Sequence, residues 1–426
     1  MSLLVNKMDE KSKQIELMAP VGSWESLAAA IKAKCDSVYF GVTELNMRAS
    51  SSKKFTIKDL PDIVSRCHEN NIKTYLTLNV VMYDEDLSLM RELCDAAKEA
   101  GITAVIATDM SAILYAREIG LPVHCSTQLN VSNIEAVRFF SKYADVIVLA
   151  RELTLEQVAE ICEKIQTQDI RGPSGNLLRI ELFVHGALCV SIAGKCYMSL
   201  ATYNSSANRG KCYQTCRREY RVYDVDTGAE LNIKNRYVMS PKDLCTIRFL
   251  DKLIDSGATI LKIEGRGRSA DYVYTVVSAY REAIELYRRG DFSMEKAKLL
   301  EENLKTVFNR GFWHGGYYLG HKLGEWTETY GSQATKEKVF IGRVVNYYSK
   351  IGVCEIDLKA GDLEIGQDLL FTGNSTGILQ TRVESIHDDN GPVEYAVKGE
   401  KVSVPVPEKV RVNDKVFILK ERTKNS

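Results

Sequence analysis

Residues 104–119 read Ala-Val-Ile-Ala-Thr-Asp-Met-Ser-Ala-Ile-Leu-Tyr-Ala-Arg-Glu-Ile. The stretch opens with a short apolar run and continues into a segment whose apolar residues recur at helical spacing, so it predicts a strand followed by a helix. The run lacks polar alternation, which is typical of a strand buried on both faces of a parallel sheet. These residues are therefore interpreted as one βα unit.

The same βα pattern recurs along the first two thirds of the chain. The eight expected strands are Ile15–Pro20, Ser37–Gly41, Lys73–Asn79, Ala104–Asp109, Pro122–Gln128, Asp145–Arg151, Arg179–His185 and Ala258–Gly265. The expected helices are Trp24–Lys34, Phe55–Asn70, Asp84–Glu99, Ser111–Ile119, Asn133–Tyr143, Thr154–Gln166, Pro241–Ser256 and Ala270–Arg289. Eight such units in series favour an α/β fold of the (β/α)8 TIM-barrel type over a doubly wound sheet.

The character of the sequence changes after Tyr318. Residues 321–338 are polar and contain glycine, which is typical of a linker, and short strand-like runs with Gly and Asp-Asn turns follow. The expected organisation is a catalytic barrel over residues 1–320, a linker over 321–338 and a small all-β barrel domain over 339–426.

Composition limits the classes of function. The 56 basic and 56 acidic residues cancel, so any contact with nucleic acid must come from a local patch. The polar N-terminus and the lack of a long apolar run predict a cytoplasmic protein with no membrane segment. In that reducing compartment the 11 cysteines are expected to be core residues, metal ligands or nucleophiles, not disulfides.

The strongest chemical signal lies in a long connection, residues 188–240, after the seventh expected strand. Its cysteines follow the pattern Cys189-x6-Cys196-x15-Cys212-x3-Cys216. Four thiolates suit zinc or an iron–sulfur centre, and only the second pair has the short spacing of a zinc ribbon, which favours iron and sulfide. The alternative is four unrelated buried cysteines, but this polar, glycine-rich segment offers little core to bury them.

Polar residues at or just beyond the expected strand ends define a second candidate site, because barrel enzymes place their chemistry at the carboxyl ends of the strands. The candidate catalytic residues are Asn79, Gln128, His185 and Glu264, and the candidate substrate-binding residues are Arg48, Arg151, Lys262 and Arg266. Guanidinium groups match carboxylates bidentately, so these arginines suit the small dicarboxylate that the family resemblance described below implies. The alternatives are structural ion pairs for the arginines and a core position for the histidine.

The connection is also locally basic, with tyrosines interleaved among its cations. The candidate RNA-binding residues are Lys195, Arg209, Lys211, Arg217 and Arg218. A surface of cations and aromatic rings suits single-stranded nucleic acid. It equally suits a solvated loop whose arginines offset the negative charge of a cluster.

Residues 181–199, Glu-Leu-Phe-Val-His-Gly-Ala-Leu-Cys-Val-Ser-Ile-Ala-Gly-Lys-Cys-Tyr-Met-Ser, resemble the signature of the collagenase-like peptidases of unknown catalytic type. Supporting motifs are Ala19-Pro-Val-Gly22, Arg151-Glu-Leu-Thr-Leu-Glu156, Met239-Ser-Pro-Lys-Asp-Leu244 and Leu261-Lys-Ile-Glu-Gly-Arg266. The resemblance covers residues 15–318. It implies a four-iron–four-sulfur (4Fe-4S) cluster on Cys189, Cys196, Cys212 and Cys216.

Within that family the chain is most similar to the tRNA hydroxyuridine synthases. This resemblance implies hydroxylation of the wobble uridine with prephenate as hydroxyl source, and a tRNA anticodon loop as the macromolecular partner. One alternative is the peptidase activity of the family name, although no G-x-S-x-G or H-E-x-x-H motif occurs. The other is an accessory subunit of the ubiquinone-hydroxylation type, suggested by Gly267-Arg268-Ser269.

Overall fold

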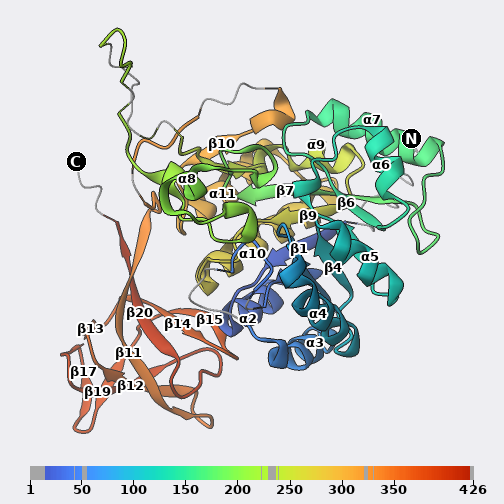
Figure 1. The fold of residues 1–426 in the computed structure, drawn as a ribbon. Helices are drawn as coiled ribbons and strands as arrows, with labels where there is room; N and C mark the ends of the chain where they lie inside the picture. Colours follow the sequence, from blue (N-terminus) through green and yellow to red (C-terminus); the bar gives the residue numbers. More distant parts are fainter. Residues whose placement is uncertain are drawn as a thin grey trace.

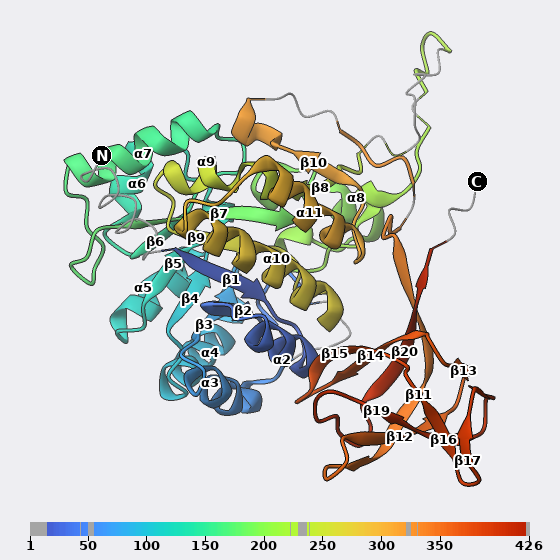
Figure 2. The ribbon, with the colours of Figure 1, turned by 180° about the vertical axis from the view of Figure 1, so that it is seen from behind.

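The computed structural model describes residues 15–42, 44–49, 55–221, 223–228, 237, 239–320, 325–329 and 331–422. Figure 1 shows a barrel surrounded by helices, with a separate β domain beside it. The same two parts are seen from behind in Figure 2, where the β domain again lies next to α2 (Trp24–Lys32) and the start of α10 (Ala270–Arg288). No helix in these described ranges is both long and apolar enough to cross a membrane.

Eight parallel strands close into the predicted barrel. They are β1 (Glu16–Pro20), β2 (Ser37–Phe40), β3 (Lys73–Leu78), β4 (Ala104–Ala107), β5 (Val123–Cys125), β6 (Val146–Val148), β7 (Arg179–Gly186) and β9 (Ile260–Ile263). Each strand pairs in parallel with the next, and β9 pairs with both β7 and β1, which completes the ring. Apolar side chains such as Met18, Tyr75 and Ile106 fill the interior, so the barrel is a packed core and not a pore.

Helices cover the outside of the barrel nearly as expected. They are α2, α3 (Leu60–His68), α4 (Leu87–Glu99), α5 (Met110–Glu118), α6 (Ile134–Phe140), α7 (Leu155–Thr167), α9 (Leu250–Asp255) and α10. Short 3-10 turns precede or replace helix starts: η1 (Ile57–Asp59), η2 (Asp84–Asp86), η3 (Thr127–Leu129) and η7 (Ile247–Phe249). A capping box between Thr154 and Gln157 begins α7.

The expected helix Pro241–Ser256 is wrong in its first part. Residues Asp243–Cys245 form strand β8, which pairs antiparallel with the end of β7 and parallel with β10 (Phe312–His314). Only residues from η7 onward are helical. A further helix, α11 (Met294–Lys305), was not predicted and packs on α10 and η7.

Where the structure describes it, the connection between β7 and β8 contains only short elements. These are η4 (Ile192–Gly194), α8 (Met198–Tyr203), η5 (Ala207–Arg209) and η6 (Thr215–Arg217). Gly210 lies where this segment meets the loop after β2, at φ +80°, and an added Cβ would lie 2.2 Å from the Asn46 carbonyl oxygen. Only glycine fits so close an approach of two backbones. The segment is therefore held over one end of the barrel.

The C-terminal domain is antiparallel, as predicted. Its strands are β11 (Lys336–Tyr348), β12 (Val353–Leu358), β13 (Leu363–Glu364), β14 (Asp368–Gly373), β15 (Gly377–Arg382), β16 (Ile386–Asp388), β17 (Gly391–Val393), β18 (Tyr395–Ala396), β19 (Lys401–Pro405) and β20 (Lys415–Glu421). The main sheet runs β15-β14-β20-β11-β12-β19-β16-β17, and within the described chain no pairing closes it into the expected barrel. Strand β11 begins inside the expected linker, of which residues 321–324 and 330 lie outside the described residues.

The two domains are in direct contact. Ala29 on α2 and Ala270 on α10 pack against Leu370 and Ile378 of the β domain. Gly377, at φ +65°, would place a Cβ 2.7 Å from the Ala29 backbone nitrogen, so the turn into β15 requires glycine there. The β domain therefore rests on the outer helices of the barrel.

Candidate functional site

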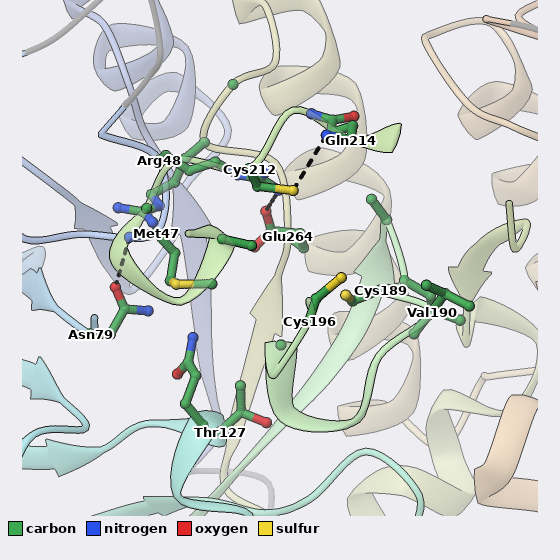
Figure 3. Close-up of a pocket in the computed structure, with 18 of the residues that line it drawn as sticks. Met47, Arg48, Asn79, Thr127, Cys189, Val190, Cys196, Cys212, Gln214 and Glu264 are labelled. Atoms are coloured by element: carbon green, nitrogen blue, oxygen red, sulfur yellow. Dashed lines mark hydrogen bonds and ion pairs between the residues drawn. The ribbon is translucent and has the colours of Figure 1, made fainter. Parts of the chain in front are cut away.

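A cavity of about 500 Å³ lies at the carboxyl ends of the barrel strands, between the barrel and the connection that follows β7. Among the residues that line it, Asn79 follows β3, Gln128 follows β5 and Glu264 follows β9. Figure 3 shows the part of this cavity around Met47, Asn79 and the cysteines. The structure thus brings most of the candidate residues of the barrel mouth and of the connection to one place.

All four cysteines of the connection line this cavity. Cys189 follows β7, Cys196 precedes α8, and Figure 3 shows their sulfur atoms directed toward one another, with Cys212 across the cavity. The backbone amide of Met198 donates to the Cys196 sulfur and that of Gln214 to the Cys212 sulfur, each at 3.4 Å. Amide donors stabilise thiolates, which is the form that binds metals.

The four cysteines of the connection form a set of soft donors for a metal centre. Thiolates that share one tetrahedral zinc must converge to about 2.3 Å from it. In the described part of the chain, no three His, Cys, Asp or Glu side chains are placed to hold one metal ion. Cys189, Cys196, Cys212 and Cys216 nevertheless surround the same cavity, so the donor set suits a larger iron–sulfur centre.

The cavity lining is strongly cationic. Six arginines and one lysine line it against one glutamate: Arg48, Arg151, Arg217, Lys262, Arg266, Arg268 and Arg310 against Glu264. An excess of positive charge in a partly enclosed site favours an anionic ligand. Arg268 and Arg310 were missed in the sequence. Arg268 lies two residues beyond Arg266 in the same motif, whereas Arg310 had no sequence signal.

Glu264 anchors an arginine. Its carboxylate accepts hydrogen bonds of 2.9 Å from the Arg48 guanidinium and from the Tyr39 hydroxyl. Burial alone would raise the pKa of Glu264, but Arg48 and the nearby Arg266 outweigh it and lower the pKa to about 2. A carboxylate of that pKa is a weak base at neutral pH, so the geometry favours a positioning role over the expected catalytic one.

The arginines that line the cavity differ in whether neighbouring side chains already accept hydrogen bonds from them. Arg266 is buried and donates to Thr77 Oγ1 at 2.6 Å and to Asn46 Oδ1 at 3.2 Å. The Arg151 guanidinium lies 5.1 Å from the Phe183 ring centroid, and within the described residues it has no hydrogen bond or ion pair. The Arg268 guanidinium likewise lies over an aromatic ring, 3.5 Å from the Phe308 ring centroid. Arg151 and Arg268 therefore keep their donor edges available to a ligand.

His185 does not line the cavity. It is 2% exposed and packs against Tyr280 and Phe312, with ring centroids at 5.5 Å in both cases. Burial, followed by the Arg268 charge, lowers the pKa of His185 to about 3, so the imidazole is neutral at physiological pH. The structure places this residue in the core beside α10 and gives its expected catalytic role no support.

The candidate RNA-binding residues fall into two groups. Arg209 binds Asp86 at 2.6 Å, and Arg217 donates to Ser240 and to the Pro241 carbonyl, so both tie the connection to its surroundings. The remaining candidates are exposed, as are tyrosines of the same segment: Lys195, Lys211 and Arg218, with Tyr197, Tyr203 and Tyr213. We call these six residues the tyrosine–cation surface. Its Tyr203 and Tyr213 rings lie 4.9 Å apart.

Comparison with known proteins agrees with the sequence motifs. The model of peptidase family U32 matches residues 22–328. The chain belongs to peptidase family U32. A protein named collagenase from Porphyromonas gingivalis strain W83 is 54% identical over 407 residues, covering 96% of this chain and 98% of the relative.

Two other relatives of the chain have different names. A protein of Methanocaldococcus jannaschii named as an uncharacterized protease is 39% identical, over 96% of this chain and 98% of its own length. The tRNA hydroxylation protein P1 of Bacillus subtilis is 30% identical, over 92% of this chain and 91% of its own. The family therefore includes proteins named as peptidases and proteins named for RNA hydroxylation.

Proposed function

We propose that the protein hydroxylates a uridine in the anticodon loop of tRNA, with prephenate as hydroxyl source and an iron–sulfur cluster on Cys189, Cys196, Cys212 and Cys216. One observation carries the proposal: the four thiols share a cavity with an excess of arginines, and the segment that bears these thiols also carries the exposed tyrosine–cation surface. When bound, such a cluster supplies electron transfer or an iron coordination site. The chain's own residues bind and orient the two substrates.

Different residues are suited to binding each of the two substrates. Arg151, Arg268 and Lys262 offer donors to a small dicarboxylate inside the cavity. Tyr203 and Tyr213 offer ring faces to unstacked bases, and Arg218 lies 5.3 Å from the Tyr203 ring. A base must leave its stack to reach a recessed cavity, which suits a single-stranded loop.

The experiment is nucleoside mass spectrometry of tRNA from a strain that lacks the gene. We expect 5-hydroxyuridine to disappear from the deletion strain and to return with a plasmid copy of the wild-type gene. Unchanged 5-hydroxyuridine in the deletion strain would contradict the proposal.

Peptidase activity is the second candidate, because the relatives that are 54% and 39% identical are named collagenase and protease. Against it, no described histidine lines the cavity, so the described lining contains no pair of a cysteine or serine nucleophile with a histidine base. The purified holoprotein is expected to leave gelatin and casein intact. Cleavage that disappears with Glu264→Gln would favour the peptidase instead.

Arg151→Ala and Arg268→Ala are each expected to weaken prephenate binding about ten- to hundredfold, because each removes a charged donor worth on the order of 1.5–3 kcal/mol. Neither guanidinium has a hydrogen-bond or ion-pair partner in the described chain, so the melting temperature should change little. Isothermal titration calorimetry measures the affinity.

Arg218→Ala is the matched control for these two changes. It should leave prephenate affinity unchanged and weaken tRNA binding, with a smaller dependence of that binding on salt. If Arg151→Ala and Arg268→Ala lower only tRNA affinity, the assignment of these arginines to the small ligand is wrong.

A further inference from the structure

Three buried polar side chains form a chain through the barrel interior, from the cavity toward the opposite wall. Lys262 on β9 lines the cavity, and its ammonium donates to Glu181 Oε1 on β7 at 2.7 Å. The other carboxylate oxygen of Glu181 lies 3.5 Å from Nδ1 of His124 on β5. The three residues are 4%, 0% and 5% exposed. Glu181 opens the signature of residues 181–199 and Lys262 lies in the Leu261–Arg266 motif, yet the expected site includes neither Glu181 nor His124.

The contact between Glu181 and His124 is incomplete. Both Oε2 of Glu181 and Nδ1 of His124 are buried and lack a hydrogen-bond partner. Burial raises the pKa of Glu181, but Lys262 and His124 outweigh it, so the carboxyl stays ionised. A carboxylate oxygen can only accept, and a neutral imidazole carries a hydrogen on one of its two nitrogens. A proton on Nδ1 would turn this unsatisfied contact into a charge-assisted hydrogen bond.

Other charged groups lie close to His124 on the neighbouring strands. The His124 ring lies 4.4 Å from the Tyr75 ring on β3, and the Tyr75 hydroxyl donates to Glu16 on β1. Glu16 also binds Lys73 and Arg179, at 2.8 and 3.1 Å. Together with Lys262, these two cations exceed the carboxylates of Glu16 and Glu181 by one positive charge. An anion bound at Lys262 would remove one unit of that excess.

Lys262 has donors to spare for such an anion. Its ammonium has three hydrogens, of which the bond to Glu181 uses one. The rings of Tyr39 and Phe183, at 4.5 and 5.4 Å, pack around it and limit its freedom. An ammonium held in this way at the floor of the cavity is pre-organised to bind an anionic group.

We propose that Lys262 binds the inner carboxylate of the ligand, that Glu181 and His124 are its positioning residues, and that His124 takes up one proton when this carboxylate binds. The proton comes from the solvent, bonds to Nδ1 and is then donated to Glu181 Oε2. The proposal rests on the proposed function only in taking a small dicarboxylate as the ligand. It requires neither RNA nor turnover.

The test is calorimetric titration of prephenate into the anaerobic holoprotein, in Hepes and in Tris at the same pH. The two buffers differ in ionisation enthalpy, so the difference in heat counts the protons taken up. We expect uptake approaching one proton per ligand, and an affinity that falls as the pH rises from 6 to 8. His124→Gln should bind with uptake near zero and an affinity that no longer changes with pH. Lys262→Met should lose about tenfold or more in affinity.

The outcomes separate this inference from the proposed function. Binding without proton uptake by the wild type, or equal uptake by His124→Gln, would overturn the inference and leave the proposed function standing. Binding with uptake, but without 5-hydroxyuridine formation, would overturn the proposed function alone. No binding of prephenate by the wild type would overturn both. A purely structural role of His124 would leave the proton count unchanged in a folded variant, which circular dichroism verifies.

Discussion

Protein with Cys212→Ser, purified without oxygen, is expected to lose nearly all of its iron and sulfide. The wild type should be brown and contain about four irons per chain, because four thiolates hold a cubane cluster. Serine places a poorly ionised hydroxyl where the cavity wall offers a soft thiolate, and the Gln214 amide then faces an oxygen. Colorimetric iron and sulfide analysis measures the loss.

The control for this change is Cys94→Ala. Cys94 is fully buried in α4, away from the cavity, and alanine removes its thiol without burying a hydroxyl. This variant should keep the iron and sulfide of the wild type. Stoichiometric zinc without sulfide in the wild-type protein would disprove the cluster.

Glu301→Ala is expected to destabilise the barrel by about 3–5 kcal/mol, the usual result of breaking a buried charge network. Glu301 lies on α11, and its side chain is 1% exposed. Its carboxylate accepts hydrogen bonds from Arg248 on η7 and from His314 on β10. It thus joins α11, η7 and β10, the last of which pairs with β8. For a domain of about 300 residues this loss corresponds to roughly 4–8 °C in the midpoint of thermal unfolding, measured by calorimetry.

The neighbouring Glu302 supplies the control. It is 66% exposed and pairs with the same Lys305 as Glu301, so Glu302→Ala should change stability by less than about 1 kcal/mol. A Glu301→Ala variant that melts with the wild type would show that the network contributes no net stability.

The stabilisation by Glu301 should also depend on pH. Burial raises its pKa, but the His314 and Arg248 contacts outweigh this and lower the pKa to about 2, from 4.5 in an unfolded chain. Because the folded-state pKa is the lower one, the stabilisation is complete above about pH 4.5 and disappears as the pH falls toward 2. The difference between wild type and Glu301→Ala should shrink across that window.

The barrel could be predicted because its signal is local and repeated. Most of the expected strands are near-continuous apolar runs and amphipathic stretches separate them, so the fold class did not depend on any single element. The prediction of a helix at Pro241–Ser256 was wrong because Asp243–Cys245 is a strand through its pairing with β7 and β10. Pairing between segments so far apart in the chain leaves no local pattern, and tertiary context decides such short runs.

The candidate site was only partly predictable, for a similar reason. Strand ends indicate which residues reach the mouth, and Asn79, Gln128, Arg151, Lys262, Glu264 and Arg266 do line the cavity. The partners of each residue depend on three-dimensional neighbours. The Glu264 carboxylate already accepts a hydrogen bond from Arg48. The extended β7 places His185 against α10 instead of in the cavity.

The pairing of β7 with β8 has a consequence for how this family can diversify. His185 lies opposite Cys245 and Gly186 lies opposite Leu244. The long segment between β7 and β8 therefore starts and ends at two strands that are paired with each other. Residues directly opposite in an antiparallel pair have Cα atoms about 4.5–5.5 Å apart. Insertions, deletions or a wholesale exchange between these anchor points need not move the eight barrel strands. Evolution can thus replace the cysteine-bearing segment as a cassette, keeping one scaffold while its chemistry changes.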